Sequence, residues 1–141
     1  MVALDADPIS LKEVDRAYGT YGVETVAAPF SMLITNRVQV GQFDLIYSTG
    51  LFDYLNKSTG RRLVSTLFRM LNPGGKLVVA NFMPGIRDVG YMEAFMDWKL
   101  IYRNRQDMVD LTMEVSESEI RDVTLFAEDS RNIIFVEVTK I

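Results

Sequence analysis

The sequence predicts an α/β fold with a doubly wound, mostly parallel sheet that ends in an antiparallel hairpin. Short apolar strands alternate with helical segments along most of the chain, which is the order typical of such sheets. The last two apolar runs are separated only by a short polar turn, as in a hairpin. Residues 77–82 are almost entirely apolar, as expected for a strand that is covered on both faces.

The first elements are predicted to be a strand, a helix and a second strand. Met1–Asp5 is a short apolar strand with an acid at its end. A helix then begins at Asp7, a favourable N-cap that is followed by proline at the first helical position, and it ends at Gly19. The second strand covers residues 23–27. Residues 30–40 permit a short helix, but the stretch is too brief to decide.

The middle of the chain contains the best-defined strand and helix. Residues 43–47 form the third strand, which follows the turn at Gly41-Gln42. From Ser58 to Leu71 the apolar residues fall on one side of a helix and the polar residues on the other, so an amphipathic helix is expected. Asn72-Pro73-Gly74 ends this helix and leads into the apolar strand at residues 77–82.

The last third is predicted to be a helix followed by a hairpin. Residues 91–113 are rich in aromatic residues and methionine at helical spacing. Residues 120–127 and 133–138 are strands, joined by the polar turn at residues 128–131. Neither an internal repeat nor a linker interrupts the chain, so residues 1–141 are expected to form a single domain.

Composition excludes several classes of protein. With 141 residues, of which 48% are hydrophobic and 24% charged, the chain is expected to fold around one core. Its formal net charge of −4 argues against nucleic acid as a partner. Because cysteine and histidine are both absent, a disulfide framework, a thiolate metal site and a hydrolase of the Ser-His-Asp or Cys-His type are excluded, and no metal site is predicted. No apolar run is long enough to span a membrane and no signal peptide is recognisable, so a cytoplasmic protein is expected.

Two segments together carry a family resemblance. Residues 43–55 describe a strand that opens into a small-residue loop, and residues 71–82 describe a turn and a second strand, as at the carboxyl edge of a parallel sheet where open α/β folds bind ligands. With the terminal hairpin, this order resembles the second half of a class I S-adenosylmethionine-dependent methyltransferase, which has a Rossmann-like sheet. The resemblance implies S-adenosyl-L-methionine as the cofactor. The family's usual first strand and its glycine-rich loop are absent, since no glycines here have Gly-x-Gly spacing.

The missing strand is central in the family's sheet. Its absence leaves a gap of roughly 10 Å between neighbouring strands, with unpaired backbone groups on both sides. Three outcomes are possible: a second copy pairs with the open edge, the first strand moves beside residues 43–47, or the first two strands detach. We expect self-association, giving a homo-oligomer through strand pairing.

The resemblance implies a set of cofactor contacts. Asp5 corresponds to the acid that binds the ribose, although a carboxylate in a turn is the alternative. Ala28 and Phe30 follow the strand where the family contacts adenine, but the usual acid is missing there and Phe30 is equally a core candidate. The loop after the third strand corresponds to the sulfonium region, and its small residues let a ligand approach the main chain. These loop residues are Ser48, Thr49, Gly50 and Leu51.

A narrower resemblance concerns residues 80–84 and 91–103. They are similar to bacterial proteins described as extracellular-factor or 3-hydroxypalmitate methyl ester biosynthesis proteins, although Met83 stands where many of those have histidine. The candidate catalytic residues that could orient an acceptor carboxyl are Asn81, Tyr47 and Tyr91. These three, like Trp98 and Tyr102, could either orient a carboxyl or line an acyl tunnel, and Arg103 could pair with a carboxylate. Core packing is the favoured interpretation for Met92, Phe95, Met96 and Trp98, whereas for Asn81 and Tyr91 function and structure are about equally favoured.

Two main functions and one weaker alternative follow. The first is S-adenosylmethionine-dependent methyl transfer to a carboxylate of a small-molecule or lipid-like acceptor, as part of a longer parent domain. A carboxylate needs no general base because it is already ionised near neutral pH, so the lack of histidine is compatible with this reaction. The second is a catalytically inert module that acts in self-association or protein interaction. A nicotinamide-dependent protein is a weaker alternative, because its fingerprint is also absent.

Overall fold

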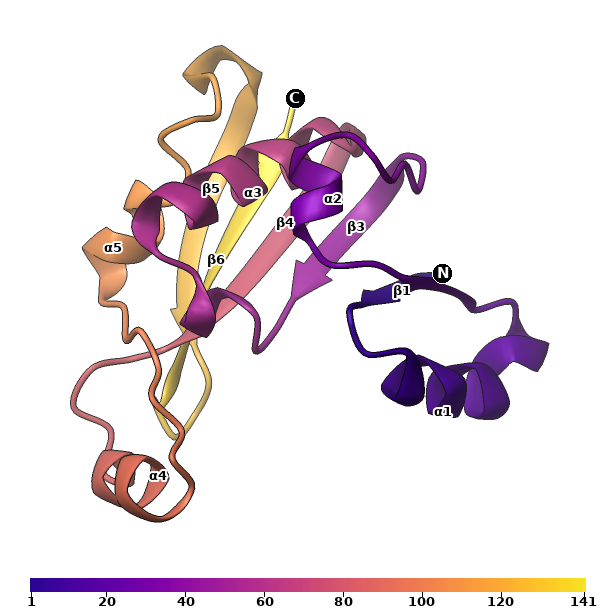
Figure 1. The fold of residues 1–141 in the computed structure, drawn as a ribbon. Coiled ribbons are helices and arrows are strands. Elements are labelled where there is room, and N and C mark those ends of the chain that lie inside the picture. The colour runs from indigo at the N-terminus through magenta and orange to yellow at the C-terminus, as the bar shows by residue number, and fades with distance from the viewer. The chain divides into compact units, whose positions relative to one another are not determined.

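The computed structural model describes all 141 residues, and the chain divides into two compact units, Met1–Gly41 and Gln42–Ile141. Each unit has its own sheet, as Figure 1 shows. The first sheet has the strand order β1-β2 and the second has the order β3-β4-β6-β5. None of the helices has the length and the apolar character needed to cross a membrane.

The first unit confirms the predicted strand, helix and strand. Its elements in order are β1 (Val2–Asp5), α1 (Pro8–Tyr18), a 3-10 turn at Gly19–Tyr21, β2 (Glu24–Ala27) and α2 (Ser31–Ile34). The two strands are parallel, with Asp5 opposite Ala27. Asp7 caps α1 as predicted, because its carboxylate accepts hydrogen bonds from the amides of Ile9 and Ser10. The ambiguous stretch at residues 30–40 contains the short helix α2.

The second unit contains a four-stranded mixed sheet. Its strands are β3 (Phe43–Ser48), β4 (Leu71–Phe82), β5 (Ile120–Ala127) and β6 (Ile133–Lys140). β3 and β4 are parallel, whereas β6 is antiparallel to both β4 and β5, which confirms the predicted hairpin. Hydrogen bonds pair β1 only with β2, so of the three possible outcomes the one in which the first strand pairs with β3 is not formed.

The Asn-Pro-Gly-Gly turn lies inside a longer strand than predicted. β4 already begins at Leu71, opposite Phe43, and the register then jumps so that Leu45 faces Lys76. The extra residues on β4 bulge out, and Gly75 passes close to the neighbouring strand. A Cβ at Gly75 would lie 2.9 Å from the carbonyl oxygen of Asn72 and 3.1 Å from that of Phe43, so only glycine fits without a shift.

The single helix predicted for residues 91–113 is wrong. Two short helices, α4 (Val89–Phe95) and α5 (Arg105–Asp110), are separated by residues 96–104. Asp97 has φ of 47°, which is incompatible with helix continuation. The amide of Arg103 donates to Phe82 on β4 instead of to its own helical turn, and Asn104 starts α5 with a capping box. The aromatic residues therefore have helical spacing, but the backbone of residues 101–103 forms hydrogen bonds with Asp53 and Phe82 instead of within a helix.

Side chains on the two faces of the second sheet differ in how far they are buried. On one face, the β4 and β6 side chains Leu77, Val79, Val136 and Val138 are fully buried. α3 (Lys57–Arg69) crosses the sheet, as seen in Figure 1, and buries its predicted apolar stripe. On β3, Leu45 and Tyr47 point to the opposite face and are 56% and 62% exposed. The core of this unit therefore lies on the α3 side.

Candidate functional site

The carboxyl ends of β3 and β4 meet at one edge of the second sheet. Ser48 ends β3 opposite Val79, and Thr49 and Gly50 continue directly into a loop. Gly50 has φ of 81°, and no atom lies within 4 Å of the place where a Cβ would stand. The main chain at Gly50 is therefore open to close approach.

A small pocket opens at this edge. Its volume is about 60 Å³, and it brings together three of the predicted site residues, Thr49, Gly50 and Asn81. The remaining lining residues are Asp53, Ala80, Phe82, Ile133 and Phe135. Most of the wall is apolar, so the pocket suits a small apolar group next to a few polar ones.

Asn81 lines this pocket but is itself buried, and its amide makes three hydrogen bonds within the protein. Its Nδ2 donates to the carbonyl of Ile101 at 2.8 Å and to that of Phe82 at 3.0 Å. Its Oδ1 accepts a hydrogen bond from Arg103 Nη1 at 2.5 Å. The same guanidinium donates to the carbonyls of Phe52, at 2.6 Å, and Leu55. Arg103, expected to face a carboxylate ligand, is instead only 4% exposed and binds neutral oxygens within the protein.

Asp53 is a site residue that sequence reasoning missed. Only 2% of it is exposed, and its Oδ1 accepts a hydrogen bond from the amide of Phe82 at 2.7 Å. Burial raises the pKa of this carboxyl, although the Phe82 amide and the nearby Arg103 charge act in the opposite direction. The available signal was an acid between Phe52 and Tyr54, directly after the small-residue loop.

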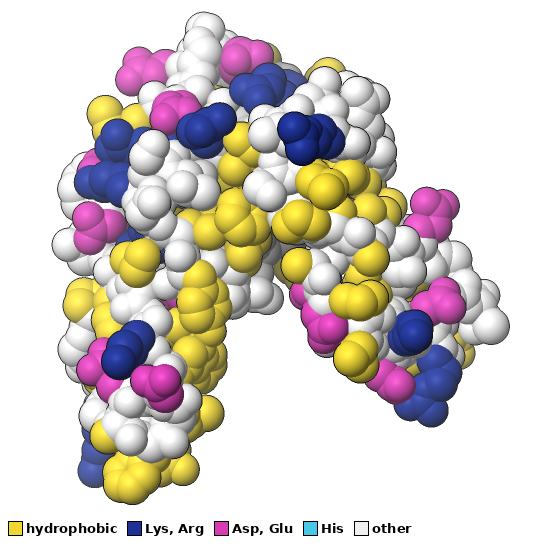
Figure 2. Space-filling model, viewed as in Figure 1, with side chains coloured by type: hydrophobic (Ala, Val, Ile, Leu, Met, Phe, Trp, Pro, Cys, Tyr) yellow, Lys and Arg dark blue, Asp and Glu magenta, His cyan; other side chains and the backbone are white.

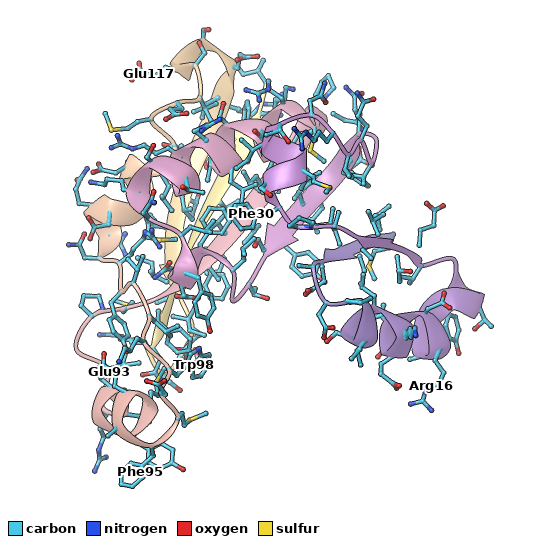
Figure 3. The ribbon with its side chains drawn as sticks, in the orientation of Figure 1. Arg16, Phe30, Glu93, Phe95, Trp98 and Glu117 are labelled. Atoms are coloured by element: carbon cyan, nitrogen blue, oxygen red, sulfur yellow. The ribbon has the colours of Figure 1, made fainter.

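None of the aromatic candidates lines the pocket. Trp98 packs edge-to-face on Phe82, with ring centroids 5.8 Å apart, and its indole N–H donates to the Tyr54 hydroxyl. Tyr91 stacks on Phe95 at 5.4 Å, and both are exposed on α4, where Figure 2 shows hydrophobic side chains gathered at the tip. Tyr47 is exposed on β3. Figure 3 shows Trp98 near the end of the sheet and Phe95 at the far tip of α4.

The core interpretation of the aromatic segment holds only in part. Met92 is buried, as expected of a core residue. Phe95 and Met96 are 81% and 54% exposed, so the prediction that they pack in a core is wrong. The helical spacing predicted burial on one face of a long helix. α4 ends at Phe95, so no continuous helix packs these side chains against the sheet.

The first unit carries three further predicted cofactor residues, Asp5, Ala28 and Phe30. Asp5 is exposed at the end of β1, and its Oδ1 accepts a hydrogen bond from the amide of Asp7 at 2.8 Å, as in the alternative turn interpretation. Its other carboxylate oxygen makes no hydrogen bond within the protein. Ala28 is buried directly after β2 and donates its amide to the carbonyl of Asp5, while Phe30 is half-buried. The three residues follow the ends of two paired parallel strands, where such sheets bind ligands.

Comparison with known proteins agrees with this architecture. The family model described as "Methyltransferase domain" matches residues 1–79. The chain is similar in structure to a possible exported protein from Bordetella parapertussis, with a TM-score of 0.74 and 19% identity, covering 99% of this chain and 52% of that one. It is also similar to the N-methyltransferase NodS from Bradyrhizobium japonicum WM9 in complex with S-adenosyl-l-homocysteine, with a TM-score of 0.65, 14% identity and coverage of 99% and 65%.

A third similar structure is SMU.1697c, a putative methyltransferase from Streptococcus mutans in complex with SAH. Its TM-score is 0.61 at 11% identity, covering 99% of this chain and 75% of that one. No curated protein sequence matches the chain. The chain thus spans only about half of the Bordetella protein and under two thirds of NodS. Its fold is the predicted Rossmann-like sheet, and because the family model covers more than half of the residues, the chain belongs to the methyltransferase domain family.

Proposed function

We propose that this chain takes part in S-adenosylmethionine-dependent methyl transfer to the carboxylate of a small or fatty-acid-like acceptor, as part of a longer parent domain. The observation that carries the proposal is the apolar pocket at the carboxyl ends of β3 and β4, which Thr49, Gly50 and Asn81 share. Parallel sheets of this class bind their ligands at that edge. Membership of the methyltransferase domain family gives the reaction class.

The residues at the strand ends fit the proposed cofactor. S-adenosylmethionine supplies an electrophilic methyl group when bound. The Asp5 carboxylate has one oxygen without a partner, which suits the vicinal hydroxyls of a ribose. Ala28 and Phe30 follow the next strand and are proposed to contact the adenine. In the second unit, residues 48–51 are proposed to bind the sulfonium end, with the open main chain at Gly50 allowing close approach.

The acceptor class is inferred from the pocket wall and from the residue types available. Phe82, with Trp98 packed on it, offers apolar surface to an aliphatic chain. The chain has no histidine, and a carboxylate oxygen can attack a methyl carbon without a general base. The hydroxyls of Tyr47 and Tyr91 are proposed to orient the acceptor, and Asn81 to hold the pocket wall.

The acceptor class can be tested with methyl-labelled S-adenosylmethionine and three decyl compounds: decanoic acid, decan-1-ol and decylamine. We expect label in methyl decanoate only. Gly50→Ala should abolish transfer because its Cβ would occupy space next to the main chain that the ligand is proposed to fill. Gly85→Ala is the control and should leave transfer intact, since Gly85 has a similar positive φ and similarly open surroundings. Label in the amine or ether product instead would overturn the carboxylate proposal.

A second candidate function is an inert module for self-association or protein interaction. The favouring observation is the outer edge of β3, which has no hydrogen-bonded neighbour and exposes Leu45 and Tyr47. Such an edge pairs readily with another strand. A module of this kind would form oligomers and transfer no methyl group from labelled cofactor.

A further inference from the structure

Arg103 occupies a buried position that no predicted role explains. Its side chain is 4% exposed, and a buried guanidinium is costly unless its donors are satisfied. Three oxygens from two separate segments satisfy it. Nη1 donates to the Phe52 carbonyl at 2.6 Å and to Asn81 Oδ1 at 2.5 Å, and Nη2 donates to the Leu55 carbonyl. All three acceptors are neutral, so the fork of N–H donors, and not an ion pair, makes the contact.

The acceptors lie on both sides of the candidate site. Phe52 begins the short 3-10 turn Phe52–Tyr54 in the loop after β3, and Leu55 directly follows that turn. Asn81 lies near the end of β4. The guanidinium therefore bridges the loop after one parallel strand to the end of the next strand.

Other hydrogen bonds close the same junction. Asp53 accepts the Phe82 amide through its side chain at 2.7 Å and the Ile101 amide through its carbonyl at 2.7 Å. The Arg103 amide donates to the Phe82 carbonyl at 2.9 Å, which fixes the backbone of the residue that carries the fork. The loop after β3, the end of β4 and residues 101–103 thus form one hydrogen-bonded junction.

This junction lies directly beside the pocket. Thr49 and Gly50 come shortly before the 3-10 turn whose ends accept hydrogen bonds from Arg103, a set of contacts that we call the clamp. Both residues line the pocket with Asp53 and Asn81. The space around the α-carbon of Gly50 is open, with no atom within 4 Å of where a Cβ would stand, so local packing does not hold this residue. Ser48 pairs with Val79 before this loop, and after Gly50 the hydrogen bonds at Phe52, Asp53 and Leu55 hold the loop near the end of β4.

We infer that Arg103 is a positioning residue: its guanidinium fork holds the loop after β3 against the end of β4 and so sets the shape of the candidate cofactor and acceptor site. This inference rests on the proposed function for the meaning of the site, but the clamp itself can be measured without ligand. A lysine would keep the charge, yet its single ammonium lacks the planar fork that reaches two carbonyls and an amide oxygen together.

The experiment compares Arg103→Lys with Arg105→Lys, the same change at an exposed position two residues away. Amide hydrogen exchange is measured for residues 49–55 and, as a reference, for the β5–β6 hairpin. We expect exchange in the loop to rise by about tenfold or more in Arg103→Lys, with the hairpin unchanged and Arg105→Lys like the wild type. The affinity for S-adenosylhomocysteine, measured by calorimetry, should fall by about tenfold in Arg103→Lys only.

Arg103→Gln serves as a second variant if Arg103→Lys does not fold, because it removes the buried charge and keeps a single amide donor. Unchanged loop exchange in the folded variants would overturn the inference, and so would equal loss of protection in the loop and the hairpin, which would identify an ordinary core residue. Failure of the wild type to bind S-adenosylhomocysteine contradicts the proposed function instead. Loop exchange then still decides whether the fork holds the loop.

Discussion

The buried carboxyl of Asp53 in the pocket wall makes the stability of the protein depend on pH. Burial raises its pKa above the ordinary value of 3.8, so the ionised form is disfavoured in the folded protein relative to the unfolded chain. The contribution of Asp53 to stability is therefore complete below pH 3.8 and is lost as the pH rises through the raised pKa.

Asp53→Asn removes this titration while its amide oxygen can still accept the Phe82 N–H. We predict that the urea midpoint of the variant rises relative to that of the wild type as the pH increases above 3.8 and through the raised pKa of Asp53. Denaturation curves at several pH values measure the difference. If the two midpoints change in parallel with pH, the pKa of Asp53 is not raised in the folded protein and the explanation is wrong.

Tyr102 has a buried hydroxyl oxygen without any hydrogen-bond partner. Burial raises its pKa, and the negative charges of Glu93 and Asp53 add to the effect. In the folded protein the Tyr102 hydroxyl loses its hydrogen bonds to water and makes none in their place. Tyr102→Phe removes this cost, so the free energy of unfolding should rise by about 1 kcal/mol. Tyr91→Phe is the control, since that residue is 61% exposed. Equal effects of both changes on urea unfolding would refute the explanation.

At the level of residues, sequence reasoning located the open loop but not its supports. Thr49, Gly50 and Asn81 do share a pocket, because strand ends and small residues are visible in a sequence. Asp53 and Arg103 escaped because their roles depend on hydrogen bonds to backbone atoms about 30 to 50 residues away, namely Phe82 for Asp53 and Phe52 for Arg103. Such partners leave no periodic pattern.

Among the elements, the Asn-Pro-Gly-Gly bulge sets how β3 meets β4. A Cβ at Gly75 would fall 2.9 to 3.2 Å from three backbone oxygens, which cannot move aside as a side chain could. Gly75→Ala is therefore predicted to lower the free energy of unfolding by about 1–3 kcal/mol. Gly90→Ala provides the control, because a Cβ there meets no atom within 4 Å. Chemical denaturation that finds the two variants equally stable would count against this account.

Strands and the amphipathic helix were predictable, whereas the long aromatic helix was not. Apolar runs and a one-sided stripe report burial directly, so β1 to β6 and α3 were all expected from the sequence. Residues 91–113 mimic the helical period, but the positive φ of Asp97 and the capping box at Asn104 break the helix. The capping pattern around Asn104 was the local signal that was overlooked.

For the whole molecule, the division into two sheets leaves strand edges open. The outer edge of β3 is unpaired and carries the exposed Leu45 and Tyr47. If copies associate through this edge, light scattering should give a mass above 16.0 kDa at tens of micromolar chain. The double change Leu45→Lys and Tyr47→Lys should return the monomer mass, because lysines on an edge strand oppose pairing. A monomeric wild type would argue against self-association.

The order of elements along the chain was predictable, but the separation into two units could be stated only as one of several outcomes. Pattern and spacing identify strands one at a time, and the choice of partner for an open edge depends on contacts that no local signal encodes. For the same reason, the sequence could offer Asp5 and the 48–51 loop only as candidate cofactor contacts, without showing which hydrogen bonds support each of them.

Titration with S-adenosylhomocysteine by calorimetry tests the central claim, that the strand ends of this chain bind a sulfonium nucleoside. We predict micromolar binding of one ligand per chain, weakened about tenfold or more by Asp5→Asn, which keeps the turn oxygen but loses the charge. Asp15→Asn, on the exposed surface of α1, should bind like the wild type. The absence of any binding heat at millimolar ligand would contradict the claim.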